Sequence, residues 1–495
     1  MQNSQPAPRA SRPAPIGWRS TALLIAVALA TRLITFGNPI LYTDEEFYFA
    51  VGRAMVNGAW PFVDIWDRKP IGLFLLYAGP AALPGQAGIW LYQAMALACA
   101  AATAFVVARL AAAAGWARGG VSAGIAYLAW ITIAGGQGGQ APVFYNLLMA
   151  LAALLIVDGA GRGRWRGLLA MGLVGLAIQI KYTAALEGVF FGLWLVRAEW
   201  RRSERAGTAI GWAVLLGLVA LLPTLVAAGV YAEAGELRPF LYANFLSILA
   251  RHPDPRGEEL VNLAKAAAIL GPILAMAARS RGATAEAEGA PRTFLRGWLV
   301  VALVAFALLP PWTDHYTLPV ILPGVAAAAG WLGRPQARTG GAALLLIAAL
   351  IGQASLVFDR HQRGTPRQFA ALVRVVGRGP GCLYVYSSSS MLYPATGRCA
   401  VSPFVFPSHL TRRREEGAIG MDQHAALDRI FAAAPAVVVM GPPYQGERPE
   451  IRAAALAHLA ADYRLVAENR LGRKQVAVYR LRLPRPPGRV FSRFD

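Results

Sequence analysis

The sequence predicts a polytopic α-helical membrane protein with a small α/β domain at its C-terminal end. Of its 495 residues, 56% are hydrophobic and only 15% are charged, whereas a soluble domain carries roughly a quarter charged residues. Apolar runs of bilayer length recur between Thr21 and Phe358, and a spanning helix needs about 20 mostly apolar residues. From about Asp359 the composition changes to that of an ordinary soluble domain.

The basic residues set the expected topology. Most of the net charge of +21 comes from arginines in short loops between apolar segments, and such loops lie in the cytoplasm according to the positive-inside rule. Nucleic acid is not an expected partner, because zinc-ligand spacing, a recognition-helix pattern and a basic stripe with interleaved aromatics are all absent from the sequence. The clusters expected in the cytoplasm are Ala117–Gly119, Arg162–Arg166, Arg197–Arg205, Arg279–Arg296 and Arg334–Arg338.

The N-terminal segment resembles a signal peptide, because Arg9, Arg12 and Arg19 precede an apolar run. The run ends at Thr31 and Arg32 instead of a small-residue cleavage site. We therefore predict a cytoplasmic tail over residues 1–19 and an uncleaved first span.

Two spans between neighbouring basic clusters give about eleven spans in a membrane domain over residues 20–357. In order they are Thr21–Phe36, Ile89–Leu110, Val121–Gly135, Val143–Val157, Gly167–Ile180, Thr183–Leu195, Gly207–Val230, Leu260–Ala278, Leu299–Leu309, Tyr316–Leu332 and Gly341–Val357.

One further apolar segment, Pro70–Pro84, does not fit this alternation as a span. If it crossed the membrane, Arg109 and Arg118 would face outward and every later basic loop would be inverted. The segment is also short and contains Pro80. We therefore predict an interfacial or re-entrant helix, which leaves the loop 38–69, the loop Tyr231–Glu259 and Pro310–His315 on the external face.

Residues 358–495 are predicted to form the external, periplasmic α/β domain. β-branched and aromatic runs bounded by Gly, Ser and Pro predict strands, whereas amphipathic runs predict helices. The strands are Gly381–Ser387, Ala436–Met440 and the pair Tyr463–Glu468 and Lys474–Leu481, and the helices are Asp422–Ala434 and Pro449–Ala461. Cys382 and Cys399 would form a disulfide outside the cytoplasm, but two unpaired thiols are about equally expected.

The first external loop concentrates acidic residues beside the membrane. Thr43 and Glu46 have the spacing of a capping box, which would place Asp44 and Glu45 in the first turn of a helix. Apolar residues follow at helical spacing, which suits a helix lying on the membrane surface. This structural interpretation is complete by itself, and from these residues alone it has the same weight as a catalytic one.

A second acidic pair favours the catalytic interpretation over the structural one. Asp64 and Asp67 precede Arg68 and Lys69, directly before Pro70, and charged groups usually avoid the bilayer surface unless they are used. Acids next to bases at a membrane face suit a reaction between a hydroxyl acceptor and a phosphate-bearing lipid. The alternative for Arg68 and Lys69 is ordinary snorkelling at the interface.

With these residues the sequence resembles bacterial membrane glycosyltransferases of the GT-C fold. They include the protein O-mannosyltransferase-like group, the aminoarabinose transferase of lipid A and the rhizobial galacturonosyltransferase-like proteins. The resemblance lies in Asp44-Glu45 with Tyr48, in Gly58 to Lys69-Pro70, and in His315-Tyr316 followed by Pro319. It covers the membrane part, but Ile71 stands where this family usually has a second proline.

The resemblance implies an inverting glycosyltransferase in the bacterial cytoplasmic membrane that uses a sugar on polyprenyl phosphate and acts on the external face. Because phosphate leaves without a protonating acid, one carboxylate base is enough to accept the proton of the attacking hydroxyl. We assign Asp44 as that base and Glu45 as its support. Lys69, and with it Arg68, would hold the phosphate as point charges, and Tyr48 lies one helical turn from Asp44.

The remaining candidates keep two interpretations each. Lys181, His315 and Tyr316 bind the donor or merely anchor helices at the interface, and Asp64 and Asp67 serve as acceptor-binding or supporting groups. No cofactor is required, although a divalent metal on Asp44, Asp64 and Asp67 remains an alternative. The acceptor is a hydroxyl of a lipid, a polysaccharide or a protein.

Two other functions compete with this one. A transporter or flippase of lipid-linked sugars would show buried charges near mid-bilayer and paired broken helices, and the sequence has few such charges and no half-to-half symmetry. A non-catalytic scaffold that presents the C-terminal domain would leave the acidic loop unexplained beyond capping.

Overall fold

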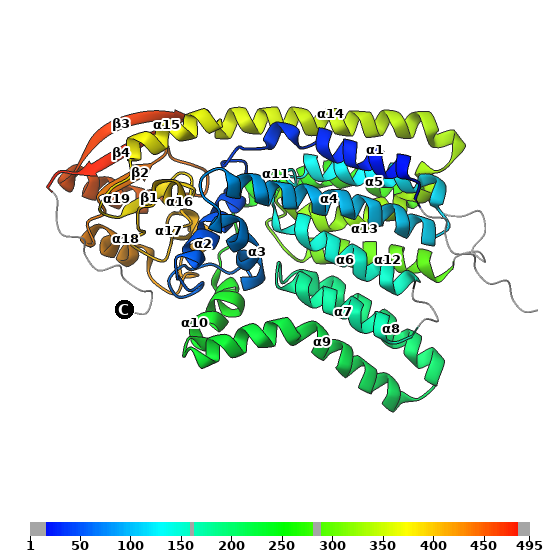
Figure 1. Cartoon of the computed structure of the whole chain (residues 1–495). Coiled ribbons are helices and arrows are strands. Elements are labelled where there is room, and N and C mark those ends of the chain that lie inside the picture. Colours follow the sequence, from blue (N-terminus) through cyan, green and yellow to red (C-terminus); the bar gives the residue numbers. More distant parts are fainter. Residues whose placement is uncertain (1–15, 159–162, 281–288, 484–495) are drawn as a thin grey trace, which may run out of the picture.

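A bundle of long helices forms most of the molecule, and a small sheet domain lies at one end of it (Figure 1). The computed structural model describes residues 16–158, 163–280 and 289–483. Within these residues each predicted span coincides with a helix. They are α1 (Trp18–Ala30), α4 (Ala87–Ala113), α5 (Ala117–Ile133), α6 (Ala141–Asp158), α7 (Trp165–Ile178), α8 (Ala184–Ser203), α9 (Ala206–Glu233), α11 (Arg256–Arg279), α12 (Ala290–Ala307), α13 (Leu318–Leu332) and α14 (Arg338–Arg363).

Among the described residues, 7 helices are long and apolar enough to cross a membrane: α1, α4, α6, α9, α11, α12 and the continuous helical stretch that contains α14. The other predicted spans, α5, α7, α8 and α13, are shorter or carry more charge. Helix α9 packs on α7 and α8 at the edge of the bundle, and its large apolar residues, such as Leu218 and Leu222, are exposed. Lipid is the solvent that suits such a surface, so the predicted class of a multi-pass membrane protein is confirmed.

The predicted helix in the loop 38–69 has a buried first half, Glu45–Gly52, which corrects the prediction that it lies on the membrane surface. Helix α2 (Thr43–Val56) packs along α3 (Ile71–Ala82). A side chain at Gly52 would come within 2.8 Å of the Tyr77 backbone, so glycine permits this close approach. The other face of α2 meets the C-terminal domain, where Phe47 contacts Phe406 with 5.0 Å between ring centroids.

The C-terminal domain contains a four-stranded sheet with the order β1-β2-β4-β3. β1 (Leu383–Ser387) and β2 (Val437–Met440) are parallel, and β4 (Lys474–Leu481) runs antiparallel to both β2 and β3 (Tyr463–Leu471). All four strands, and helices α18 (Gln423–Ala432) and α19 (Pro449–Asp462), agree with the predictions. Helices α15 (Pro366–Val376), α16 (Leu392–Thr396) and α17 (Ser408–Thr411) were not predicted.

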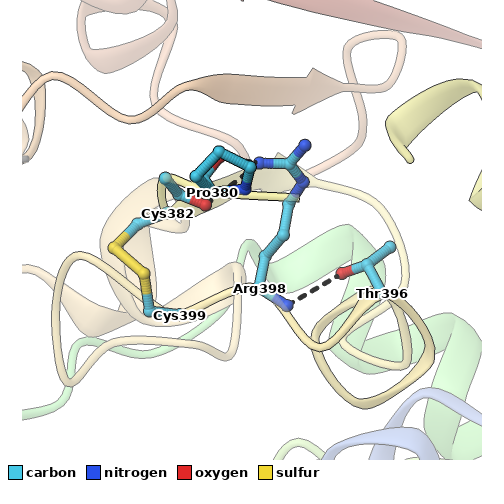
Figure 2. Close-up of a disulfide and its surroundings, with 6 residues drawn as sticks. Pro380, Cys382, Thr396, Arg398 and Cys399 are labelled. Carbon is cyan, nitrogen blue, oxygen red and sulfur yellow. Dashed lines mark hydrogen bonds between the residues drawn. A yellow bond between two sulfur atoms is a disulfide. The ribbon is translucent and has the colours of Figure 1, made fainter. Parts of the chain in front are cut away.

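Cys382 and Cys399 form a disulfide, which decides between the two alternatives left open by the sequence. Figure 2 shows the bond beside Arg398, whose guanidinium donates to the carbonyl oxygens of Pro380 and Gly381 at 2.8 and 3.0 Å. The bond and these contacts hold the start of β1 against the loop that follows α16.

Short helical turns join the longer elements. They are η1 (Leu33–Thr35), α10 (Leu237–Leu241), the π-helical turn η2 (Tyr242–Leu246), η3 (Ser247–Ala250), η5 (Asp314–Thr317), η6 (Pro335–Ala337) and η7 (Arg413–Glu415).

Candidate active site

A cavity of about 580 Å³ lies where the predicted external loops meet the C-terminal domain. Its walls come from the start of α2, the residues before α3, the junction of α7 and α8, the end of α12, η5 and the segment 406–415. Eight of the ten predicted site residues line it: Asp44, Tyr48, Asp67, Arg68, Lys69, Lys181, His315 and Tyr316. Folding therefore gathers residues that are far apart in the sequence.

Asp44 lies in the first turn of α2 and faces the cavity. Gln140, directly before α6, donates a hydrogen bond to its carboxylate at 3.0 Å. Burial by itself would raise the pKa of Asp44, but Lys69, His315 and the Gln140 bond together hold it below its usual value. Asp44 is therefore a carboxylate at neutral pH, as a base must be.

Lys69 is held by Asp67, which was predicted as a supporting residue. The Lys69 ammonium lies 3.3 Å from the Asp67 carboxylate, and its backbone N–H donates to the same group at 2.9 Å. The rings of Tyr48 and Phe406 lie 5.3 and 5.7 Å from the ammonium. Burial opposes the charge, but Asp67 and Asp44 raise the pKa of Lys69, so this cation persists in the cavity.

Lys181 is the second cation beside Asp44. It sits between α7 and α8, and its ammonium lies 4.6 Å from the centroid of the Tyr316 ring. Burial lowers the pKa of Lys181 to about 8, against the attraction of Asp44. A bound anion would relieve this desolvation, so Lys181 is suited to hold a phosphate.

His315 belongs to a series of contacts through Tyr42 to Arg363 that was not predicted from the sequence. Its Nδ1 lies 2.9 Å from the Tyr42 hydroxyl, and burial lowers the pKa of His315 to about 4, so the ring is neutral at pH 7. Arg363, at the end of α14, lies over the Tyr42 ring at 5.1 Å and donates to the Thr43 hydroxyl at 2.8 Å. Arg363 also lines the cavity.

These contacts correct the predicted capping box. Thr43 is already the first residue of α2, its N-cap is Tyr42, and no side chain caps the helix. The Thr43 hydroxyl accepts from Arg363 instead, and the Glu46 carboxylate lies 3.9 Å from the same guanidinium. A capping box does occur at α15, between Thr365 and Gln368, where none was predicted from the sequence.

The C-terminal domain supplies part of the cavity wall through α17 and η7. The buried carboxylate of Glu415 pairs with Arg68 at 2.6 Å and also with Arg251. Arg412 and Arg414 line the cavity and pair with Asp254, which precedes α11, at 3.1 and 2.8 Å. Only the fold brings these segments together, so no spacing along the sequence predicts these contacts.

Two predicted residues lie apart from the cavity lining. Glu45 is buried behind it, beside Gly138 and Gly139, and burial raises its pKa to about 8. Asp64 is exposed and accepts the Trp60 backbone N–H at 2.7 Å, which closes a turn. Among the residues that the structure describes, no three His, Cys, Asp or Glu side chains gather in a metal-ligand arrangement.

Apolar residues also line the cavity. They are Ala302, Ala305, Phe306 and Leu309 near the end of α12, Pro310, Ile180 and Ile248 of η3. The cavity wall thus combines charged and apolar side chains, which suits an amphipathic ligand with an anionic head.

The arrangement of the helices and of the C-terminal domain is that of the GT-C fold, a fold of membrane glycosyltransferases. ArnT from Cupriavidus metallidurans, solved bound to undecaprenyl phosphate and in the apo state, matches with a TM-score of 0.62 and 16% sequence identity. The match covers 92% of this chain and 97% of that chain.

An oligosaccharyltransferase from Archaeoglobus fulgidus matches with a TM-score of 0.52 and 10% identity, over 85% of this chain and 68% of that one. No protein-family model and no curated protein matches the sequence. The likeness therefore concerns the fold.

Proposed function

We propose that this protein is an inverting glycosyltransferase that moves a sugar from a polyprenyl-phosphate donor to a hydroxyl acceptor. One observation carries the proposal: a carboxylate, Asp44, shares a cavity with Lys69 and Lys181, and apolar side chains line the same cavity. The cations suit the phosphate and the apolar walls suit the first isoprene units. ArnT, which shares the fold, was solved with undecaprenyl phosphate bound.

The proposed reaction is a single displacement. The acceptor oxygen forms a bond to the anomeric carbon while the bond from that carbon to the phosphate oxygen breaks, and its electron pair stays on the phosphate. Asp44 accepts the hydroxyl proton. Lys69 and Lys181 stabilise the charge that develops on the departing polyprenyl phosphate. Attack opposite the leaving group inverts the anomeric configuration.

The external face of the bacterial cytoplasmic membrane is the proposed location of the site. Disulfides persist in oxidising compartments, and the Cys382–Cys399 bond lies in the domain that completes the cavity wall. The basic segment Arg197–Arg205, at the end of α8 and before α9, lies remote from that domain (Figure 1). The N-terminus is then cytoplasmic, and residues 358–495 form a periplasmic domain.

A transfer assay in membranes tests the function, with a panel of labelled polyprenyl-phosphate sugars and membrane extracts as acceptor. Asp44→Asn keeps the shape of the side chain and removes the base, so we expect a loss of transfer of about 10²–10⁴-fold. Asp64→Asn is the matched control, because Asp64 is exposed outside the cavity, and it should retain full activity.

Unchanged transfer by Asp44→Asn would refute the role of the base. Movement of the lipid-linked sugar across vesicle membranes by the wild type, without any transfer, would favour the alternative function of a flippase.

A further inference from the structure

The proposed reaction leaves one carboxylate in the cavity wall without a role. Glu187 lies in the first turn of α8, within the membrane part. Its side chain is only 3% exposed, yet it borders the cavity. Lys181, Tyr182 and Thr183, which directly precede α8, border the same cavity, so Glu187 belongs to the same part of the chain that lines it.

Glu187 has a hydrogen-bond donor but no charge partner among the described residues. The indole N–H of Trp298 on α12 donates to one carboxylate oxygen. The carboxyl group of Glu187 is otherwise buried, and no lysine, arginine or histidine in the described chain forms an ion pair with it. Helices α8 and α12 pack together here, and Ala302, one turn beyond Trp298, also lines the cavity.

Burying a carboxyl group without a paired cation costs free energy. Ionisable groups inside a membrane domain usually face a functional cavity. A carboxylate accepts about four hydrogen bonds, so one bond from Trp298 leaves most of its capacity free. A ligand in the cavity is the source of further donors.

The chemistry of the proposed donor decides which part of it Glu187 meets. The phosphate diester and the isoprenoid chain have no hydrogen-bond donor, and a carboxylate repels the phosphate. The acceptor hydroxyl donates its proton to Asp44 in the proposed reaction and so is not available to Glu187. The sugar ring, with its hydroxyl or amino groups, is the remaining donor of hydrogen bonds.

Building on the proposed function, we propose that Glu187 binds the hydroxyl or amino groups of the donor sugar and determines sugar specificity. Sugar hydroxyl or amino groups would supply the hydrogen bonds that Glu187 lacks beyond the one from Trp298. A second carboxyl group next to this buried acidic side chain would be unfavourable, because two like groups in one site oppose each other's ionisation. We therefore infer a donor sugar that is neutral or an amino sugar, and not a uronic acid.

Binding measured on the purified full chain in detergent tests this without an acceptor. The probes are undecaprenyl phosphate itself and its esters with glucose, galactose and mannose, each paired with the ester of the corresponding uronic acid. The wild type should bind at least one neutral ester about tenfold more tightly than its uronic acid partner and than the sugar-free lipid.

Glu187→Gln keeps an acceptor for Trp298 and replaces the carboxyl group by a neutral amide. We expect it to reduce both preferences about tenfold while the Kd for undecaprenyl phosphate changes less than twofold. Trp298→Phe is the matched control, because it removes the indole donor and leaves the carboxylate. It should lower the Tm and keep the preference for the neutral ester.

Three results would overturn the inference: equal binding of neutral and uronic acid esters by the wild type, no advantage of any ester over the sugar-free lipid, or a preference retained in Glu187→Gln. If the wild type failed to bind undecaprenyl phosphate at all, the proposed function itself would fall, and this result is distinct from the other three.

Discussion

Lys181 is a cavity residue whose charge changes just above neutral pH. Burial lowers its pKa to about 8, so the cation is present below that pH and is lost as the pH rises through it. If Lys181 holds the donor phosphate, the KM for the donor should rise about tenfold for each pH unit above 8. Steady-state assays between pH 6 and 10 measure this directly.

Lys181→Arg provides the matched control, because a guanidinium stays protonated throughout this range. Its KM should be nearly independent of pH up to pH 10. The same alkaline rise in both proteins would exclude Lys181 as the titrating group.

Arg363 is a positioning residue at the start of α2. It contacts Thr43, Glu46 and Tyr42, and Tyr42 in turn contacts His315. Arg363→Met should therefore lower kcat about 10-fold or more, because a small misplacement of a catalytic group is costly, while donor binding stays within about threefold. Arg363→Lys should recover part of the loss.

Kinetics with donor and acceptor varied separately, together with Tm measurements, test this role. Arg360→Met, on the exposed side of the same helix, is the control and should behave like the wild type. An equal change in KM and kcat, with a large drop in Tm, would point to a merely structural contact.

At the scale of elements, η7 and the preceding α17 hold the C-terminal domain against the loop 38–69. Glu415 is the centre of this contact, paired with Arg68 and Arg251. Burial would raise its pKa, but Arg251, Arg68 and His409 lower it from 4.5 to about 2. This difference corresponds to a stabilisation on the order of 3 kcal/mol.

The lowered pKa of Glu415 determines how this stabilisation changes with pH. The contribution is complete above the ordinary pKa of 4.5 and is lost as the pH falls toward about 2. Glu415→Gln should therefore lower the Tm strongly at pH 7 and much less near pH 3. The neighbouring Glu416→Gln is the control, because its side chain is 46% exposed. Equal Tm values for the wild type and Glu415→Gln at pH 7 would contradict this role.

At the scale of the whole molecule, the proposed orientation predicts which surfaces a membrane-impermeant maleimide reaches in intact cells. In a Cys99→Ser background, Ala457→Cys on α19 should be labelled from outside. Ala206→Cys, beside the basic loop at the start of α9, should be labelled only after permeabilisation. Both alanines are exposed. The reverse pattern would invert the topology and remove the argument for a re-entrant α3.

Much of the fold followed from the sequence because it depends on local patterns. Apolar runs and basic loops located the helices that coincide with the eleven predicted spans, and strand and helix patterns located most of the C-terminal domain. The prediction of a capping box at Thr43 was wrong because of a tertiary contact. Arg363, more than three hundred residues away in the sequence, donates a hydrogen bond to the Thr43 hydroxyl, which the local pattern had placed at the end of the helix as its cap.

The sequence by itself determined the class of membrane protein and the polar loops that gather at one cavity, because hydrophobicity, charge and turn residues act locally or through the bilayer. Only the tertiary structure decided which side chains share that cavity. It added Gln140, Glu187, Arg363 and Glu415, separated Asp64 from the site and paired Cys382 with Cys399. The physical reason is that burial and long-range pairing depend on three-dimensional neighbours, which spacing along a chain does not encode.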